Sequence, residues 1–403
     1  MTGASRRGPG QGGPHLRATG TDGRPLSARS AVDPFIVMDV MERARQAEAS
    51  GRGIVHMEVG QPGTPAPAAA RAALTRAMEA GPLGYTVALG LPELRGRIAR
   101  HYRERHDVDV DPGRIVITAG ASAGFVLAFT ALFDAGDRVG LGLPGYPSYR
   151  QILRALSIEA VGLRTRAADR YQPVPGGLPG DLDGLIVASP SNPTGTMLDA
   201  AALRALIDAC AANGTALISD EIYQGIDYGD RAVSALELSD DVTVVNSFSK
   251  YFSMTGWRVG WMVVPAAHVR TYERLAQNMF ICAPHASQVA ALAAMDAEDE
   301  LQANLAVYRR NRELMIEGLP TAGFDRFAPP DGAFYVYADV SHLTDDSMAL
   351  CTELLDVAGV ATTPGLDFDP ARGAGTLRFS YARSTADIED GLARLRRFRD
   401  RQR

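Results

Sequence analysis

Short, continuous apolar runs recur along the chain between segments of helical periodicity, and this alternation restricts the fold more than any other feature. The runs predict strands at residues 114–118, 137–143, 185–188, 216–219, 242–245 and 259–264. Helices are predicted between them, at residues 120–132, 149–156 and 200–212. Because such strands must be covered on both faces, the pattern predicts an α/β fold with a mostly parallel sheet flanked by helices. Ligand sites in these sheets lie at the carboxyl ends of the strands.

The pattern changes after about residue 290, which predicts a second, smaller α+β domain. The expected elements are a helix at 300–318, an antiparallel strand at 334–337, a helix at 348–358, a strand at 376–380 and a closing helix at 385–399. A helix at 32–50 and a strand at 54–59 come before the large domain. We therefore expect a flexible tail (1–30), an N-terminal segment that packs with the small domain (31–59), a large domain (60–300) and a small domain (301–403).

Composition excludes several classes of function. The 403 residues carry a formal charge of −6, which argues against nucleic acid as a general partner. No apolar run is long enough to span a membrane, and none follows Arg6-Arg7 to make an export signal. Cys210, Cys282 and Cys351 lie too far apart to form a metal-ligand pair. We expect reduced, packed cysteines, a cytoplasmic location and no metal.

Lys250 is the only lysine in the chain, although the sequence holds 41 lysines and arginines together. Arginine cannot replace lysine in carbonyl chemistry, because its guanidinium stays protonated and forms no useful Schiff base. The lysine lies five residues after the predicted strand 242–245, in the segment Ser247-Phe-Ser-Lys250. Its position at a strand end predicts that the amine takes part in the chemistry of the protein.

The segment from Ser247 to Lys250, followed by Met254-Thr-Gly-Trp-Arg258-Val-Gly260, resembles the lysine signature of the aspartate aminotransferase superfamily. These are the fold-type I enzymes of aminotransferase class I/II, which depend on pyridoxal 5'-phosphate (PLP). The resemblance implies that Lys250 holds PLP as a Schiff base and acts as general acid and base in transamination between an amino acid and a 2-oxo acid.

The resemblance also implies roles for residues at other strand ends. Asp220 would face the pyridine nitrogen, Tyr223 and Asn192 its phenolic oxygen, and Tyr146 would stack on the ring. The phosphate would bind the residues Ala121, Ser122, Ser247, Ser249 and Arg258. Arg378, with Asn192 and the backbone at Gly60, would bind the substrate carboxylate. Taken singly, each of these residues also fits an ordinary role in a turn, a cap or a strand.

Tyr85, in Gly84-Tyr85-Thr86, resembles the family tyrosine that reaches the PLP phosphate of the neighbouring subunit. The resemblance therefore implies a homodimer with shared active sites. The sequence does not identify the amino acid or the 2-oxo acid. Phe280, Ile281 and Tyr335 are candidates for a hydrophobic substrate pocket, although packing in the core is the simpler expectation for all three.

Three alternatives are open from the sequence. The first is other PLP chemistry on the same fold: a β-lyase, a decarboxylase or a cyclising enzyme. The second is a non-catalytic PLP-binding module of a transcription regulator, for which residues 1–30 are too short to supply a DNA-binding domain. The third is a serine hydrolase, because Gly120-Ala-Ser122-Ala-Gly124 matches the nucleophile-elbow pattern and Asp220 and His285 follow in the required order.

Overall fold

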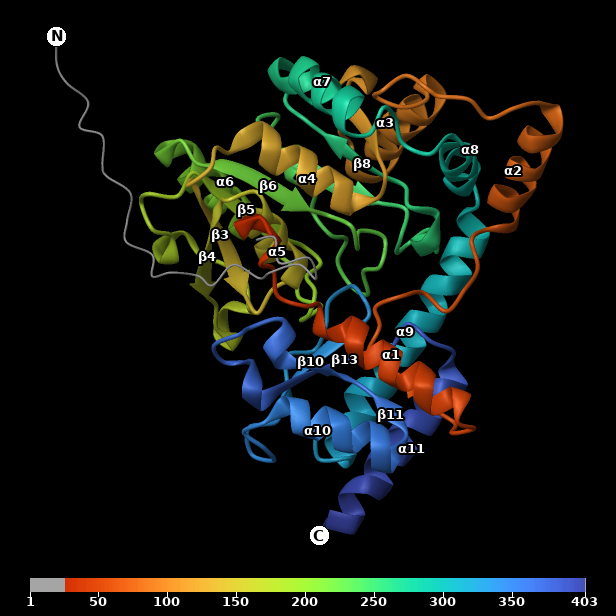
Figure 1. The fold of residues 1–403 in the computed structure, drawn as a ribbon, viewed down its shortest axis with the longest axis vertical. Coiled ribbons are helices and arrows are strands. Elements are labelled where there is room, and N and C mark those ends of the chain that lie inside the picture. Colours follow the sequence, from red (N-terminus) through yellow and green to blue (C-terminus); the bar gives the residue numbers. More distant parts are fainter. Residues whose placement is uncertain (1–25, 403) are drawn as a thin grey trace.

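The structure is a computed structural model that describes residues 26–402. Its centre is a seven-stranded sheet with the strand order β2-β8-β7-β6-β5-β3-β4 (Figure 1). β8 alone runs against the common direction of the other six strands, so the predicted mostly parallel sheet is confirmed. The strands of this sheet are β2 (Ile115–Thr118), β3 (Arg138–Leu143), β4 (Glu159–Arg164), β5 (Gly184–Ala188), β6 (Ala216–Asp220), β7 (Thr243–Ser247) and β8 (Gly260–Val263).

Helices cover both faces of this sheet, as the doubly apolar strands require. Along β5, Leu185 and Val187 enter one hydrophobic cluster while Ile186 enters the other, because successive side chains of a strand point to opposite faces. The helices that belong to this part of the chain are α2 (Ala68–Ala80), α3 (Pro92–His106), α4 (Ala121–Leu132), α5 (Pro147–Ala155), α6 (Ala200–Asn213), α7 (Val269–Met279) and α8 (His285–Ala294).

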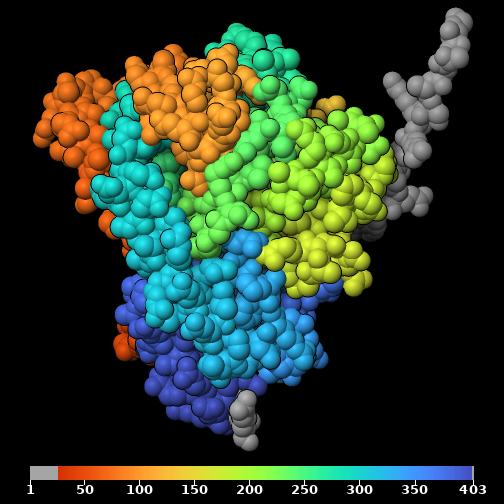
Figure 2. Space-filling view, turned by 180° about the vertical axis from the view of Figure 1, so that it is seen from behind, coloured from red at the N-terminus to blue at the C-terminus, as the bar shows by residue number. Residues whose placement is uncertain are grey.

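The C-terminal part of the chain forms a second sheet, which has four antiparallel strands in the order β12-β13-β10-β9. Its strands are β9 (Arg326–Phe327), β10 (Tyr335–Asp339), β12 (Thr363–Pro364) and β13 (Thr376–Ser380). The helices around it are α9 (Glu298–Thr321), α10 (Ser347–Glu353), which continues as a π-helical turn (Leu354–Ala358), and α11 (Thr385–Gln402). From behind, these C-terminal segments gather at one end of the molecule and the central-sheet segments at the other (Figure 2).

The N-terminal segment folds back onto the C-terminal part of the chain. Strand β1 (Val55–His56) pairs in parallel with β11 (Val360–Ala361), and α1 (Ile36–Ala49) packs on β11 and β12 (Figure 1). Val40 and Ala44 of α1 share a small hydrophobic cluster with Leu355. The tail predicted at 1–30 lies outside the described residues except for 26–30, which include a short 3₁₀ helix (Ala28–Ser30). Within residues 26–402, no helix is both long and apolar enough to cross a membrane.

Candidate active site

The carboxyl ends of β5, β6 and β7 lie side by side, because these strands pair in parallel and in register. A cavity of about 250 Å³ opens at this edge of the sheet. It lies where the large sheet, the small sheet and the N-terminal segment meet. Site residues predicted from the sequence that line it are Gly60, Tyr146, Asn192, Asp220, Tyr223, Lys250 and Arg378. Gly60 and Arg378, which are 318 residues apart in the chain, therefore contribute to one site.

Lys250 lies three residues after β7, and its amine points into this cavity. Its Nζ donates a hydrogen bond to the carbonyl oxygen of Gly60 at 2.7 Å and lies 5.6 Å from the ring centre of Tyr223. Burial lowers the pKa of the amine from 10.5 to about 8, and the positive charges of Arg378 and Arg258 act in the same direction. An appreciable fraction of this amine is therefore neutral near pH 7, as a nucleophile or a base requires.

Asp220 ends β6 as a buried carboxylate. Burial raises its pKa to about 6, although hydrogen bonds from Tyr149 and from the backbone of Ile222 oppose this effect. The Tyr149 hydroxyl donates to Oδ2, and the Ile222 amide donates to Oδ1 at 3.1 Å. Asp220 is therefore mostly ionised near neutral pH and places a negative charge in the buried wall of the cavity.

Arg378 reaches the cavity from β13. Its Nη1 donates to Oδ1 of Asn192 at 2.9 Å, and its guanidinium carbon lies 4.5 Å and 4.7 Å from the ring centres of Tyr335 and Phe368. Nη2 donates to the carbonyl oxygen of Glu58. Its Nε is buried and has no hydrogen-bond partner within the described part of the chain. A planar cation held this firmly, with a donor still free, fits a carboxylate ligand.

The hydroxyl groups of Tyr223 and Tyr335 form a hydrogen bond of 2.7 Å beside Arg378. The same Tyr335 hydroxyl occupies the space that a Cβ would take at Gly60. A larger residue at position 60 would therefore collide with the tyrosine pair. The glycine lets the backbone that accepts the Lys250 hydrogen bond pass close to the site.

The N-terminus of α4 forms a second polar region with Arg258. Gly120 precedes the helix with a φ of 78°, and a Cβ at this position would collide with the Arg258 guanidinium. Helix N-terminal amides, here those of Ala121 and the residues after it, together with an arginine make a site for an anion such as a phosphate. Ser247 and Ser249 lie at the end of β7, with their hydroxyl oxygens 2.9 Å apart.

Six predicted site residues do not line this cavity, namely Tyr85, Ala121, Ser122, Ser247, Ser249 and Arg258. Ser122 is exposed and lines an apolar groove with Val32, Val126 and Ile152 instead. Tyr85 is 82% exposed.

The expectation that Phe280 and Ile281 pack in the core is wrong. They are 37% and 51% exposed, because they lie in the connection between α7 and α8 rather than in an element that faces the sheet. Tyr335, the third residue of that group, is buried and lines the cavity.

The three residues of the hydrolase alternative do not form a triad. Asp220 is bonded to Tyr149 and Ile222, and Nδ1 of His285 lies 2.8 Å from the carbonyl oxygen of Gly84. Within residues 26–402, no hydrogen bond connects either group to Ser122. The nucleophile-elbow match is therefore a coincidence of small residues at a strand-to-helix turn.

The sequence interpretation missed several residues of the cavity. Tyr149 lies three residues after Tyr146, one helical turn along α5, and this spacing was the available signal. Four side chains in and next to α1 also line the cavity, namely Phe35, Val37, Met38 and Met41. Their contribution had no local signal, because it depends on how α1 packs against the rest of the chain.

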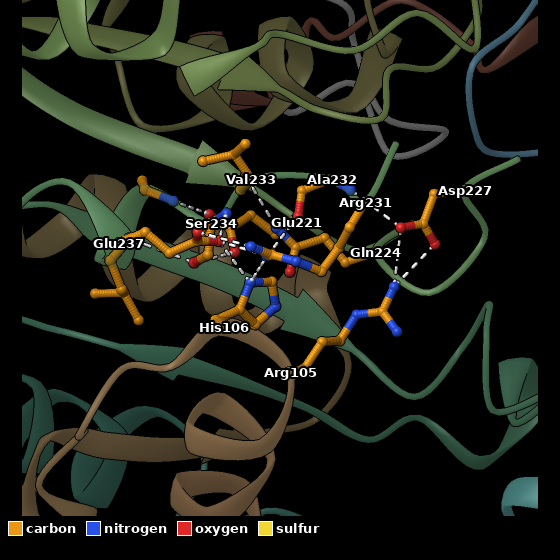
Figure 3. Close-up of polar contacts among 12 residues, drawn as sticks. Arg105, His106, Glu221, Gln224, Asp227, Arg231, Ala232, Val233, Ser234 and Glu237 are labelled. Atoms are coloured by element: carbon orange, nitrogen blue, oxygen red, sulfur yellow. Dashed lines mark hydrogen bonds and ion pairs between the residues drawn. The ribbon is translucent and has the colours of Figure 1, made fainter. Parts of the chain in front are cut away.

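Glu221 is the first residue after β6 and makes hydrogen bonds to the loop that follows (Figure 3). Its carboxylate accepts hydrogen bonds from the hydroxyls of Ser219 at 3.0 Å and Ser234 at 2.8 Å, and from the amide of Ala235 at 2.8 Å. It is fully buried, and burial raises its pKa to about 7. Farther along the loop, Glu237 pairs with Arg231. This network holds the loop against the strand that carries Asp220.

Comparison with known proteins identifies the family of this chain. The family model for aminotransferase class I and II matches residues 52–395. The valine–pyruvate aminotransferase of Mycobacterium tuberculosis is 47% identical over 92% of this chain and 97% of its own length. A crystal structure of an aminotransferase from M. tuberculosis has a TM-score of 0.92 at 46% identity, covering 94% of this chain and all of the other. The arginine–pyruvate transaminase of Pseudomonas aeruginosa is 32% identical over 92% of this chain and 96% of its own length.

The fold and the site define a fold-type I, PLP-dependent enzyme. More particularly, the chain belongs to the aminotransferase class I and II family, and it is an aminotransferase that moves an amino group between an amino acid and a 2-oxo acid. The residues present fit the cofactor, because one cavity presents a lone amine and a buried carboxylate and an anion-binding helix N-terminus with Arg258 lies close by. The comparisons favour none of the other PLP reactions.

Proposed function

We propose that the enzyme uses Lys250 as its cofactor-linking amine and prefers an amino donor with an apolar side chain and a single carboxylate, with a 2-oxo acid such as pyruvate as acceptor. The observation that carries the proposal is the composition of the cavity wall. Apolar side chains that line it include Phe35, Met38, Met41 and Ile222, and we expect the donor side chain to face them. Among the described residues that line the cavity, Arg378 is the one arginine.

When bound, PLP supplies an aldehyde and an electron-accepting pyridine ring. Asp220 would lie at the ring nitrogen, where its negative charge keeps a proton on that atom. Asn192 and Tyr223 would face the phenolic oxygen, and Tyr146 would stack on the ring. The amides of Ala121 and Ser122, the hydroxyls of Ser247 and Ser249 and the Arg258 guanidinium would hold the phosphate.

Lys250 would take the proton from the substrate Cα and would deliver it to the C4′ atom of the cofactor. Its lowered pKa leaves neutral amine available for this step at neutral pH. Arg378 and Asn192 would bind the α-carboxylate and so fix which bond at Cα faces the amine. The apolar wall of α1 would cover the substrate side chain and exclude water. A second carboxylate placed against this wall would lose its hydration without gaining a cation.

The preference for apolar donors also agrees with the valine–pyruvate activity named for the M. tuberculosis relative. A donor panel tests it. Valine, alanine, leucine, aspartate and glutamate are each assayed against pyruvate and 2-oxoglutarate. We expect kcat/KM for the best apolar donor to exceed that for aspartate by 10-fold or more, since one unpaired buried charge costs at least about 1–3 kcal/mol. Equal or higher kcat/KM for aspartate would contradict the donor assignment.

The role of Lys250 is tested separately with Lys250→Ala. This variant should lack the absorbance of PLP covalently bound to the lysine. Its turnover should be lower than that of the wild type by about 10²–10⁴-fold or more. Borohydride should fix a pyridoxyl group on Lys250 in the wild-type protein, which peptide mass spectrometry detects. Met348→Ala, an exposed methionine on α10, serves as a control that should retain both properties. Substantial turnover in Lys250→Ala would contradict the assignment.

We also propose a homodimer in which Tyr85 of each subunit reaches the phosphate site of the other. The support is the exposure of large hydrophobic side chains: Tyr85 is 82% exposed and Val87, two residues later, is 59% exposed. A mixing experiment tests the sharing of sites. Tyr85→Ala and Lys250→Ala proteins, each weakly active alone, should regain part of the activity when they are mixed, because one of the two sites in a mixed dimer is intact. A protein that is monomeric by light scattering and fully active would refute the proposed dimer.

Two further proposals concern location and domain organisation. We propose a cytoplasmic location, supported by three free cysteines, of which Cys210 and Cys351 are buried. Cell fractionation with antibody detection checks it. We further propose that residues 60–300 form the large, PLP-binding domain and 301–403 the small one, with 31–59 packed on the latter. Limited proteolysis should cut first near the exposed Gln61, in the connection between 31–59 and 60–300, because the boundary at 300/301 lies inside α9.

A further inference from the structure

The hydroxyl of Tyr149 makes the one side-chain hydrogen bond to Asp220 within the described part of the chain. Tyr149 lies in the first turn of α5, whereas Asp220 ends β6, 71 residues later. Both side chains are buried. With the Ile222 amide on Oδ1, the tyrosine on Oδ2 gives each carboxylate oxygen one neutral donor. The orientation of the carboxylate about its side-chain bonds is therefore set by Tyr149 together with the Ile222 amide.

The Tyr149 ring itself is held in place by neighbouring aromatic rings. The Phe125 ring from α4 meets it edge-to-face at 4.9 Å, and the Tyr146 ring meets it at 5.3 Å and 80°. The next residue, Arg150, donates from Nη2 to the carbonyl oxygen of Asp367 at 3.0 Å, which ties α5 to the C-terminal part of the chain. These contacts restrict the movement of the Tyr149 ring and therefore hold its hydroxyl at the Asp220 carboxylate.

The hydrogen bond between Tyr149 and Asp220 has one possible direction, from the phenol to the carboxylate. Burial raises the pKa of Tyr149 well above 10, and the negative charge of Asp220 acts the same way, so the phenol stays protonated and can only donate to the carboxylate. A donor to the charged form stabilises that form. The side chains facing Asp220 are Tyr149 of α5, Tyr146 just before this helix and Lys250 after β7. Of these, Tyr149 alone donates a side-chain hydrogen bond to the carboxylate.

We propose that Tyr149 is a positioning residue of the transamination site, which holds the Asp220 carboxylate ionised and aimed at the place of the pyridine nitrogen. This inference rests on the proposed role of Asp220. Tyr149 acts through the carboxylate rather than on the substrate. Its hydroxyl supplies the compensation that a buried, ionised aspartate needs, so that the aspartate can keep the proton on the ring nitrogen when PLP is bound.

The test uses Tyr149→Phe, which removes one oxygen atom and leaves the aromatic packing. Tyr272→Phe is the matched control, because Tyr272 is a buried tyrosine of the same hydrophobic cluster but lies on α7. The pKa of Asp220 is measured in the cofactor-free protein from its carboxyl infrared band, assigned with Asp220→Asn. Losing one hydrogen bond to a charged group should raise this pKa by about 1–2 in Tyr149→Phe. It should leave the pKa unchanged in Tyr272→Phe.

PLP affinity and kinetics provide the second readout. In Tyr149→Phe we expect the Kd for PLP, measured by fluorescence titration, to rise about 10-fold and kcat to fall by a similar factor or more, with little change in the KM for the amino donor. In the Asp220→Asn background, adding Tyr149→Phe should have almost no further effect on either quantity, because the two residues act as one unit.

Two results would overturn the proposal: an unchanged Asp220 pKa in Tyr149→Phe, or effects of the two substitutions on PLP affinity that simply add. If Tyr149→Phe unfolds, the cycle is repeated with Tyr149→His, which retains a ring donor. A wild-type protein that fails to transaminate any donor would instead refute the proposed function, so the two failures are distinguishable.

Discussion

The ionisation of Lys250 gives the sharpest prediction, because the chain holds no other lysine. Reductive ¹³C-methylation of the cofactor-free protein labels one side-chain amine, which gives an NMR signal distinct from that of the N-terminal α-amine. The signal should titrate with a pKa of about 8 instead of 10.5. At pH 7 roughly a tenth of the amine is then neutral, compared with about 0.03% for an ordinary lysine. The structure therefore predicts a roughly 300-fold gain in neutral amine from burial and nearby charge.

Substitutions around Lys250 should move this pKa in opposite directions. Asp220→Asn removes a negative charge that favours the ammonium form, so the pKa should fall below 8. Arg378→Met removes a positive charge that opposes it, so the pKa should rise. Met348→Ala is the control and should not shift the signal. A titration near 10.5 in the wild type, or shifts of the same sign in both variants, would refute the electrostatic argument, because loosening of the site alone raises the pKa in every case.

Further predictions concern the residues around the site. Gly60→Ala should lower the free energy of unfolding by about 1–3 kcal/mol in urea titrations, because the new Cβ collides with Tyr335; unchanged stability would show that the segment shifts freely. Glu221 has a folded pKa raised from 4.5 to about 7, so its contribution to stability is complete below pH 4.5 and is lost as the pH rises through 7. Glu221→Gln should therefore gain stability relative to the wild type between pH 5 and pH 8; a constant difference would contradict this. Met41→Arg places a second cation in the apolar wall and should raise kcat/KM for aspartate relative to valine by about 10-fold in the donor panel. An unchanged ratio would exclude Met41 from contact with the substrate side chain.

Much of the fold follows from local sequence patterns. The predicted strand at 185–188 and the observed β5, Gly184–Ala188, differ by one residue, because a short, wholly apolar run has few alternatives to a buried strand. Elements without that signal were missed. Strand β4 is an edge strand with mostly exposed or half-buried residues, and β9, β11 and β12 have two residues each. These strands exist because neighbouring segments offer them backbone partners, and no local periodicity records that.

The sequence by itself determined the chemical groups available: one primary amine, an aspartate and a serine at the ends of neighbouring parallel strands, and a helix N-terminus beside a strand end. Parallel pairing brings such strand ends together, so their proximity could be inferred without coordinates. Only the tertiary structure decided which groups act on one another. Tyr149 on Asp220, Tyr335 on Tyr223 and the methionines of α1 in the cavity wall join segments 71 or more residues apart. Such contacts depend on how whole layers pack, because the burial that shifts the pKa of Lys250 and Asp220 is created only when those layers close around them.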